Sequence, residues 1–117
     1  MQQAVTTVTR YIYRLVSRIP RGCVLSYGEI GRIVGTGPRQ VAAAMRNCPA
    51  GLPWHRVVGA RGRLLIREPY ASLQRKLLES EGVKLLESRV DLKLHVWIFS
   101  KNRKLSLIQK PKKKRTS

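Results

Sequence analysis

Acidic residues are scarce in this sequence. Its 117 residues include 6 Asp and Glu against 24 Lys and Arg, for a formal net charge of +18 and a sequence pI near 11.3. Residues 101–117 hold eight basic and no acidic residues, so the first 100 residues remain basic, with 16 against 6. Solubility alone does not require so one-sided a charge. The imbalance favours a polyanionic partner, because each phosphate that a basic residue contacts releases condensed counterions.

Cysteines are few and long apolar runs are absent, and both facts narrow the class of protein. Cys23 and Cys48 fit no metal-ligand spacing, and a single pair does not indicate a disulfide framework. No apolar run approaches the length of a membrane span, and no hydrophobic signal segment opens the chain. We therefore expect an intracellular protein with no metal, cofactor or membrane partner. Both thiols are expected to be inert and packed as small apolar side chains.

Hydrophobic spacing predicts helices in the first half of the chain. Apolar residues recur at helical spacing over residues 5–19, which predicts an amphipathic helix that ends at 20–22. A short extended piece at 23–25 follows. Ser26 and Glu29 then form a capping-box pattern at the start of a second helix.

Two helices joined by a short glycine-containing turn predict a helix-turn-helix. The second helix is expected to end at Gly35, and Pro38 suits the first position of a third helix that runs to about Asn47. A small side chain between two arginines would let the outward face of this helix approach a phosphate-lined groove, although a solvated basic face is the alternative. This face carries Arg39, Ala43, Arg46 and Asn47.

The second half of the chain predicts a hairpin and a last helix. Residues 56–58 and 63–66 flank the glycine-containing stretch 59–62, which is typical of a β-hairpin. The expected class is therefore mainly α with a small hairpin, in a winged helix-turn-helix arrangement. A helix over 71–81 and a short strand near 93–99 complete the prediction. The helix is expected to turn three leucines inward: Leu73, Leu77 and Leu78.

Four segments, taken in order, resemble the C-terminal domain of the O6-alkylguanine–DNA alkyltransferase family. They are IPRGCVLSYGEIGRIVG (19–35), PRQVAAAM (38–45), PWHRVV (53–58) and LLESEGV (77–83). The resemblance covers roughly residues 8–97. We accordingly expect one DNA-binding domain over residues 1–97 and a basic tail over 98–117.

The resemblance also implies that the catalytic nucleophile is missing. Repair enzymes of the family carry Pro-Cys-His-Arg at the active site, and the cysteine accepts the alkyl group irreversibly. Trp54 occupies that position here, as in the alkyltransferase-like branch of the family. By the same match, His55 is the base position and Glu81 is the carboxylate that would orient it. An activated thiolate can displace an alkyl group, whereas indole offers only an N–H donor, so we expect a vestigial site with no catalytic residue.

The same resemblance implies that the third helix would bind the minor groove of duplex DNA and that the modified guanine would be flipped into a pocket. The implied DNA contacts are Tyr27, Arg39, Gln40, Ala43 and Arg46. The implied pocket residues are Tyr27, Trp54, Val57 and Arg67. Arg39 matches an intercalating finger, with a phosphate contact as the alternative, and Arg67 would lie over the base or contact a phosphate at the rim. Tyr27 would contact the phosphate of the rotated nucleotide, with a core aromatic as the alternative.

One departure from the family pattern follows the third helix. The family commonly has Asn-Pro there, and the amide ties the helix to the active-site turn. This chain has Cys48-Pro49, with Asn47 one place earlier. Either Asn47 takes over the bond or the brace is missing.

The leading functional hypothesis is a monomeric, non-enzymatic sensor of O6-alkylguanine in double-stranded DNA. It would pass the lesion to nucleotide excision repair, and a partner protein from that pathway is implied by the family alone. One alternative is an alkyltransferase that uses another cysteine. The other alternative is a general basic DNA-binding protein, in which the net positive charge alone provides the affinity for DNA.

Overall fold

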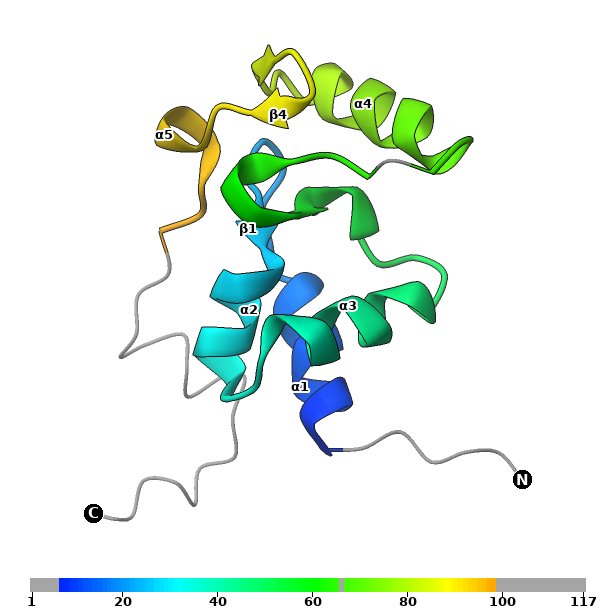
Figure 1. Cartoon of the computed structure of the whole chain (residues 1–117), viewed down its shortest axis with the longest axis vertical. Coiled ribbons are helices and arrows are strands. Elements are labelled where there is room, and N and C mark those ends of the chain that lie inside the picture. Colours follow the sequence, from blue (N-terminus) through cyan, green and yellow to red (C-terminus); the bar gives the residue numbers. More distant parts are fainter. Residues whose placement is uncertain (1–6, 66, 99–117) are drawn as a thin grey trace.

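The computed structural model describes residues 7–65 and 67–98, and over this part of the chain the protein is mainly helical (Figure 1). The elements are α1 (Thr7–Val16), β1 (Leu25–Ser26), α2 (Tyr27–Val34), α3 (Pro38–Arg46), the 3-10 turn η1 (Trp54–Arg56), β2 (Val57–Val58), the 3-10 turn η2 (Ala60–Gly62), α4 (Tyr70–Ser80), β3 (Leu85–Leu86), β4 (Arg89–Val90) and α5 (Leu92–His95). The predicted class, mainly α with a small hairpin, is confirmed. Residues 5–6 of the predicted first helix, residue 66, and residues 99–117 of the predicted tail lie outside the described residues.

The first three helices form one half of the molecule and share a hydrophobic core. Figure 1 shows α1, α2 and α3 grouped together, and α1 contacts both of the others. Ile12 and Leu15 on α1 are fully buried against Ile30 of α2 and Val41 of α3. Truncating a side chain buried to this extent costs about 2–5 kcal/mol, so this cluster holds the helix-turn-helix in place.

The ends of α2 form as their sequence predicts. Ser26 is the N-cap, and its hydroxyl accepts a hydrogen bond from the backbone N–H of Glu29 at 3.1 Å. The Glu29 carboxylate pairs with Arg32 at 2.9 Å, so only one of the two capping-box bonds forms. Gly35 ends the helix at φ 88°, a left-handed conformation that glycine adopts without strain. The turn into α3 is thus fixed by local interactions.

The predicted hairpin over 56–66 is wrong. β2 pairs in parallel with β1, in the register Leu25↔Val57 and Ser26↔Val58. Both valines of β2 are buried, so this strand lies between the two halves of the core and is not an exposed wing. Residues 60–62 form η2, and the hairpin that does exist is β3–β4. Pairing a strand with a distant segment is a tertiary effect that a local turn signal does not report.

Two further predictions about the second half also fail. On α4, Leu73 is 44% exposed, whereas Gln74 and Leu78 are fully buried and Leu77 is half-buried. The inward face of α4 is therefore rotated by one residue from the predicted one, and it includes a polar side chain. The strand expected near 93–99 is replaced by α5, followed by a single bridge that pairs Val96 with Val24.

The C-terminal end of α3 is fixed by a side chain of α1 and not by the side chain of its own C-cap residue, Asn47. The Tyr13 hydroxyl lies 2.8 Å from the carbonyl oxygen of Ala44 and 3.1 Å from that of Asn47. Within the described part of the chain, the Asn47 side chain has no hydrogen-bond partner, so it does not take over the brace to the following turn. The carbonyls at the end of α3 are satisfied by α1 instead.

Replacing Tyr13 by phenylalanine should lower the free energy of unfolding by about 1 kcal/mol, because a hydrogen bond to two helix-end carbonyls is lost while the packing is kept. Tyr11→Phe is the matched control on the same helix. Urea denaturation followed by circular dichroism compares the two variants. Equal stability of both would contradict the role assigned to the Tyr13 hydroxyl.

Candidate functional site

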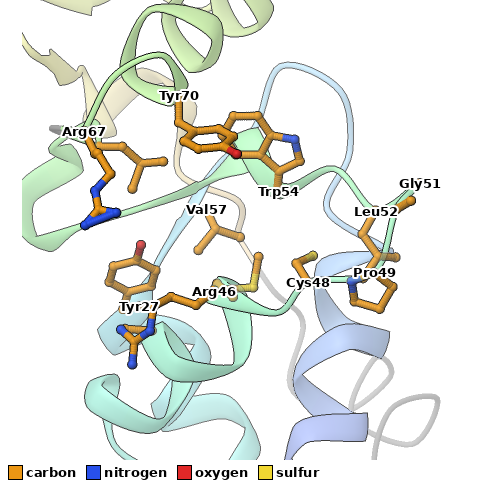
Figure 2. A pocket seen from close by; sticks show the side chains of 14 residues that line it. Tyr27, Arg46, Cys48, Pro49, Gly51, Leu52, Trp54, Val57, Arg67 and Tyr70 are labelled. Atoms are coloured by element: carbon orange, nitrogen blue, oxygen red, sulfur yellow. The ribbon is translucent and has the colours of Figure 1, made fainter.

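A cavity of about 1020 Å³ opens between the helix-turn-helix half of the molecule and the half that contains α4 (Figure 2). One side is formed by α2, α3 and segment 48–52, and the other by η1, β2 and the stretch leading into α4. Its lining residues are Tyr27, Ala42, Met45, Arg46, Cys48, Pro49, Ala50, Gly51, Leu52, Trp54, Val57, Leu65, Arg67 and Tyr70. All four residues predicted for a pocket, Tyr27, Trp54, Val57 and Arg67, therefore meet at one cavity.

Trp54 is half-buried and forms part of the cavity wall. Its indole packs edge-on against two neighbouring rings, His55 at a centroid distance of 6.1 Å and Tyr70 at 6.2 Å, with interplanar angles of 85° and 88°. In Figure 2 the Tyr70 ring lies beside the indole. Such edge-to-face contacts fix the orientation of the indole without covering it completely.

The lining of the cavity is cationic. Arg46 and Arg67 both line the cavity, and among the described residues no Asp or Glu lines it. Figure 2 shows the Arg67 guanidinium and the Tyr27 hydroxyl pointing toward one another. Burial raises the pKa of Tyr27, and the charge of Arg46 offsets part of that rise, so the hydroxyl stays protonated at neutral pH and remains a hydrogen-bond donor.

Cys48 lines the cavity, where the sequence suggested only inert packing. Burial raises the pKa of its thiol, which reduces the thiolate fraction and with it the nucleophilicity. Cys23 does not line the cavity and packs against the first core cluster. The structure thus brings one thiol to the cavity but leaves it unactivated.

Three predicted DNA contacts lie on α3 outside the cavity. Arg39 and Gln40 are exposed in the first turn of α3, and Ala43 is half-buried one turn later. Arg46 belongs to both sets, since it is exposed at the end of α3 and also lines the cavity. A helix with exposed basic residues therefore borders the cavity.

Glu81 is the hub of a buried polar cluster behind Trp54. Its carboxylate lies 2.8 Å from Nε2 of His55 and accepts hydrogen bonds from Arg56, the shortest 2.7 Å from Nη2. It also accepts one from the backbone N–H of Gly22 at 2.9 Å. The Arg56 guanidinium donates in addition to the carbonyl oxygen of Ile19 at 2.8 Å. One carboxylate therefore joins the end of α4, the η1 turn and the loop after α1.

The environment of Glu81 strongly favours its charged form. The side chain is only 5% exposed, and burial alone would raise its pKa. The hydrogen bonds from Arg56, Gly22 and His55 outweigh burial and lower the pKa of Glu81 from 4.5 to about 2. The predicted partners His55 and Glu81 are thus in contact, next to the indole of Trp54.

In the part of the chain that the structure describes, no group of three or more His, Cys, Asp or Glu side chains is arranged to hold a metal ion. Among the same residues, no helix has the length and apolar character needed to cross a membrane.

Sequence reasoning missed Tyr70, Gln74 and the bridging role of Arg56. Tyr70 falls in a stretch without motif or periodicity, and Gln74 occupies a core position that apolar periodicity assigns to leucine. The Pro-x-His-Arg pattern did contain a signal for Arg56, because an arginine next to a buried base position needs a carboxylate partner.

Comparison with known proteins adds an independent line of evidence. A family model described as 6-O-methylguanine DNA methyltransferase, DNA binding domain, matches residues 7–83. The chain is 35% identical over 93 residues to a "DNA base-flipping protein" of Escherichia coli, covering 75% of this chain and 72% of that protein. It is 37% identical over 97 residues to "Alkyltransferase-like protein 1" of Schizosaccharomyces pombe, covering 74% and 90%.

The fold is also similar to a solved complex. The crystal structure of S. pombe Atl1 with damaged DNA containing O6-carboxymethylguanine superposes with a TM-score of 0.68 at 33% sequence identity. The match covers 84% of this chain and 100% of that one. The cavity, the indole and the Glu81 cluster all lie within the matched domain or at its edge.

Replacing Glu81 by glutamine should destabilise the protein most at neutral pH. A carboxyl whose pKa is lower in the folded than in the unfolded state contributes its stabilisation above pH 4.5 and loses it as the pH falls toward 2. The contribution is about 3 kcal/mol. The stability difference between wild type and Glu81→Gln should shrink over this interval, as urea melts at several pH values would measure.

Glu79→Gln serves as the control. The Glu79 carboxylate is exposed and lies 3.7 Å from Arg75 at the surface, so its loss should change the stability little. A difference between wild type and Glu81→Gln that stays constant from pH 7 to pH 2 would refute the assignment.

Proposed function

Because the chain belongs to the 6-O-methylguanine DNA methyltransferase family, we propose that it is a non-enzymatic sensor of O6-alkylguanine in duplex DNA. It binds the minor groove through α3, turns the modified base out into the cavity and leaves the alkyl group in place. It then directs the lesion to nucleotide excision repair, whose proteins are the proposed partners. It acts as a monomer.

The single observation that carries this proposal is Trp54 in the cavity wall. Family enzymes need a thiolate at this position, next to a histidine that a carboxylate orients. His55 and Glu81 are in contact here, 2.8 Å apart, but the neighbouring side chain is an indole without a lone pair for attack. A cavity with this wall favours recognition without transfer.

The size and charge of the cavity support a flipped, modified base as its occupant. A volume of about 1020 Å³ is ample for a purine with a substituent. Flipping costs a few kcal/mol, and less where alkylation has already weakened base pairing, which itself favours the lesion. In the proposal, Trp54 and Val57 contact the alkyl group while Arg67 lies over the purine or at its rim.

The outer face of α3 supports the DNA-binding part. Arg39, Gln40, Ala43 and Arg46 are the proposed contacts, joined by Tyr27 at the mouth of the cavity. Arg39 is proposed as the residue that fills the vacated stack, because a planar, permanently charged guanidinium both stacks on bases and bonds to the orphan partner.

Competitive binding tests the proposal. Two duplexes that differ only by one O6-methylguanine compete for the protein at low and at high salt. A sensor prefers the modified duplex at both, whereas a general basic DNA-binding protein binds the two equally with a steep salt dependence. If the modified and the unmodified duplex bind with equal affinity at each of the two salt concentrations, the sensor function is ruled out.

One observation favours a second candidate, transfer to another cysteine: Cys48 lines the same cavity. The raised pKa of its thiol argues against it. Intact-mass measurement after incubation with the methylated duplex separates the two functions. A gain of one methyl group on the protein, lost in Cys48→Ser, would establish transfer.

Replacing Arg39 by alanine should reduce the preference for the modified duplex by about tenfold, because a guanidinium stacked on an aromatic ring contributes roughly 1–2 kcal/mol. Arg32→Ala is the charge-matched control, since Arg32 is an exposed arginine on α2. Competition assays at fixed salt compare the variants. If Arg39→Ala loses no more preference than Arg32→Ala, Arg39 contacts phosphate or solvent only.

Replacing Trp54 by cysteine should restore slow alkyl transfer, because His55 and Glu81 are already in contact behind this position. The readout is covalent methylation of the protein by mass spectrometry, and Trp54→Ser is the control that removes the indole without supplying sulfur. Complete inertness of Trp54→Cys would indicate that the turn after α3, with Cys48 in place of asparagine, holds position 54 out of line with the base.

A further inference from the structure

Gln74 is a polar side chain in the interior of the second half of the molecule. It lies in the second turn of α4, is 0% exposed, and is the one polar residue among the described residues that is classed with the buried core. Burying an amide costs free energy unless its hydrogen bonds are replaced. The hydrogen-bond partners of the Gln74 amide therefore indicate its role.

The amide is satisfied by three backbone groups. Its oxygen accepts from the N–H of Leu65 at 2.8 Å. Its nitrogen donates to the carbonyl oxygens of Val57 at 3.0 Å and His55 at 3.2 Å. Both amide hydrogens are used, so a flipped amide would set oxygen against two carbonyls and nitrogen against an N–H. The amide is fixed in one orientation.

These three partners belong to two different stretches of the cavity wall. His55 and Val57 bracket the backbone that follows Trp54, and Val57 itself lines the cavity. Leu65 lines it from the stretch that leads to Arg67. The Gln74 amide bridges the two stretches, because it bonds to Leu65 on one and to His55 and Val57 on the other.

The same helix also supports the indole. Tyr70 lies one turn before Gln74 and packs edge-on against Trp54 at 6.2 Å. Residues four apart share one face of a helix, so Tyr70 and Gln74 act on the same wall from a single rigid element. Tyr70 contacts the side chain of Trp54, and Gln74 holds the backbone of His55 and Val57, which follow Trp54 in the chain.

We propose that Gln74 is a positioning residue of the lesion cavity: its amide sets the separation between the Trp54–Val57 stretch and Leu65 on the opposite stretch of the wall, and through it the preference for a modified base. The inference rests on the proposed function. Gln74 touches no base; it acts through the backbone that carries the residues that would.

Two substitutions separate bonding from packing. Gln74→Met keeps the length but replaces the amide by a thioether, which donates no hydrogen bond and accepts only weakly, so one N–H and two carbonyls of the wall lose their partner. Gln74→Glu keeps the shape but sets a carboxylate oxygen against the carbonyls of His55 and Val57. Both should lower the ratio of affinities for O6-methylguanine and guanine duplexes by about tenfold or more. Binding to the unmodified duplex, which depends on α3, should change little.

Leu78→Ala is the matched control, because Leu78 is equally buried one turn further along α4 but packs in the hydrophobic cluster with Val24 and Val83. It should lower stability without changing the affinity ratio. The ratios are measured at a temperature where circular dichroism shows every variant folded. A loss of stability in Gln74→Met with an unchanged ratio, or an equal loss of ratio in Leu78→Ala, would overturn the inference.

A measurement on the unaltered protein keeps the test independent of the variants. The Leu65 amide should exchange with deuterated solvent slowly, at the rate of the buried β2 amides, because Gln74 holds it. Exchange at the rate of an open loop would overturn the bridge itself. A wild-type protein without lesion preference but with a protected Leu65 amide would instead overturn the proposed function and leave the bridge intact.

Discussion

The carboxylate of Glu81 is the constraint on which the rest of the site depends. It joins His55, Arg56 and the backbone of Gly22, and so connects α4, the η1 turn and the loop that follows α1. A buried charge of this kind is tolerated only when it is fully paired, and removing it would leave Arg56 unpaired in the interior. The η1 turn carries Trp54, so the position of the indole in the cavity wall follows from this cluster.

Under the proposed function, the Glu81 cluster has a structural role that needs no nucleophile. The resemblance implies that the histidine and the carboxylate activate a thiol in the enzymes of the family; here the contact of His55 with Glu81 fixes the η1 turn that carries Trp54. In the proposal, a lesion-binding cavity alone therefore retains His55 and Glu81. With two arginines and no Asp or Glu among its described lining residues, the cavity also suits a partner that is itself anionic. The two sides of the cavity differ in their hydrogen bonds. The Trp54–Val57 wall is bonded to Gln74 and Glu81, which are distant in the sequence. In segment 48–52 the described hydrogen bonds are local ones, such as that from the Cys48 N–H to the Met45 carbonyl oxygen.

Features set by neighbouring residues could be predicted from the sequence, and features set by distant contacts could not. The Ser26 cap and the Gly35 stop depend on residues within one turn, and both were correct. The partner of Val57–Val58 was wrong because a local glycine turn suggested Arg63–Ile66, while the structure pairs them with Leu25–Ser26 some thirty residues earlier. The resemblance led to Trp54, Val57, Tyr27 and Arg67, which do meet at the cavity, but nothing in the pattern of α4 indicated that a glutamine would replace a leucine in its core face.

The central claim is that a modified guanine enters the cavity and lies against Trp54. In a Trp97→Phe variant, which leaves Trp54 as the sole tryptophan, intrinsic fluorescence reports on that contact directly. Titration with a duplex containing one O6-methylguanine should change the emission until one lesion is bound per protein. The same duplex with guanine should bind without that change. An identical fluorescence response to both duplexes, at equal occupancy, would contradict the entry of the base into this cavity.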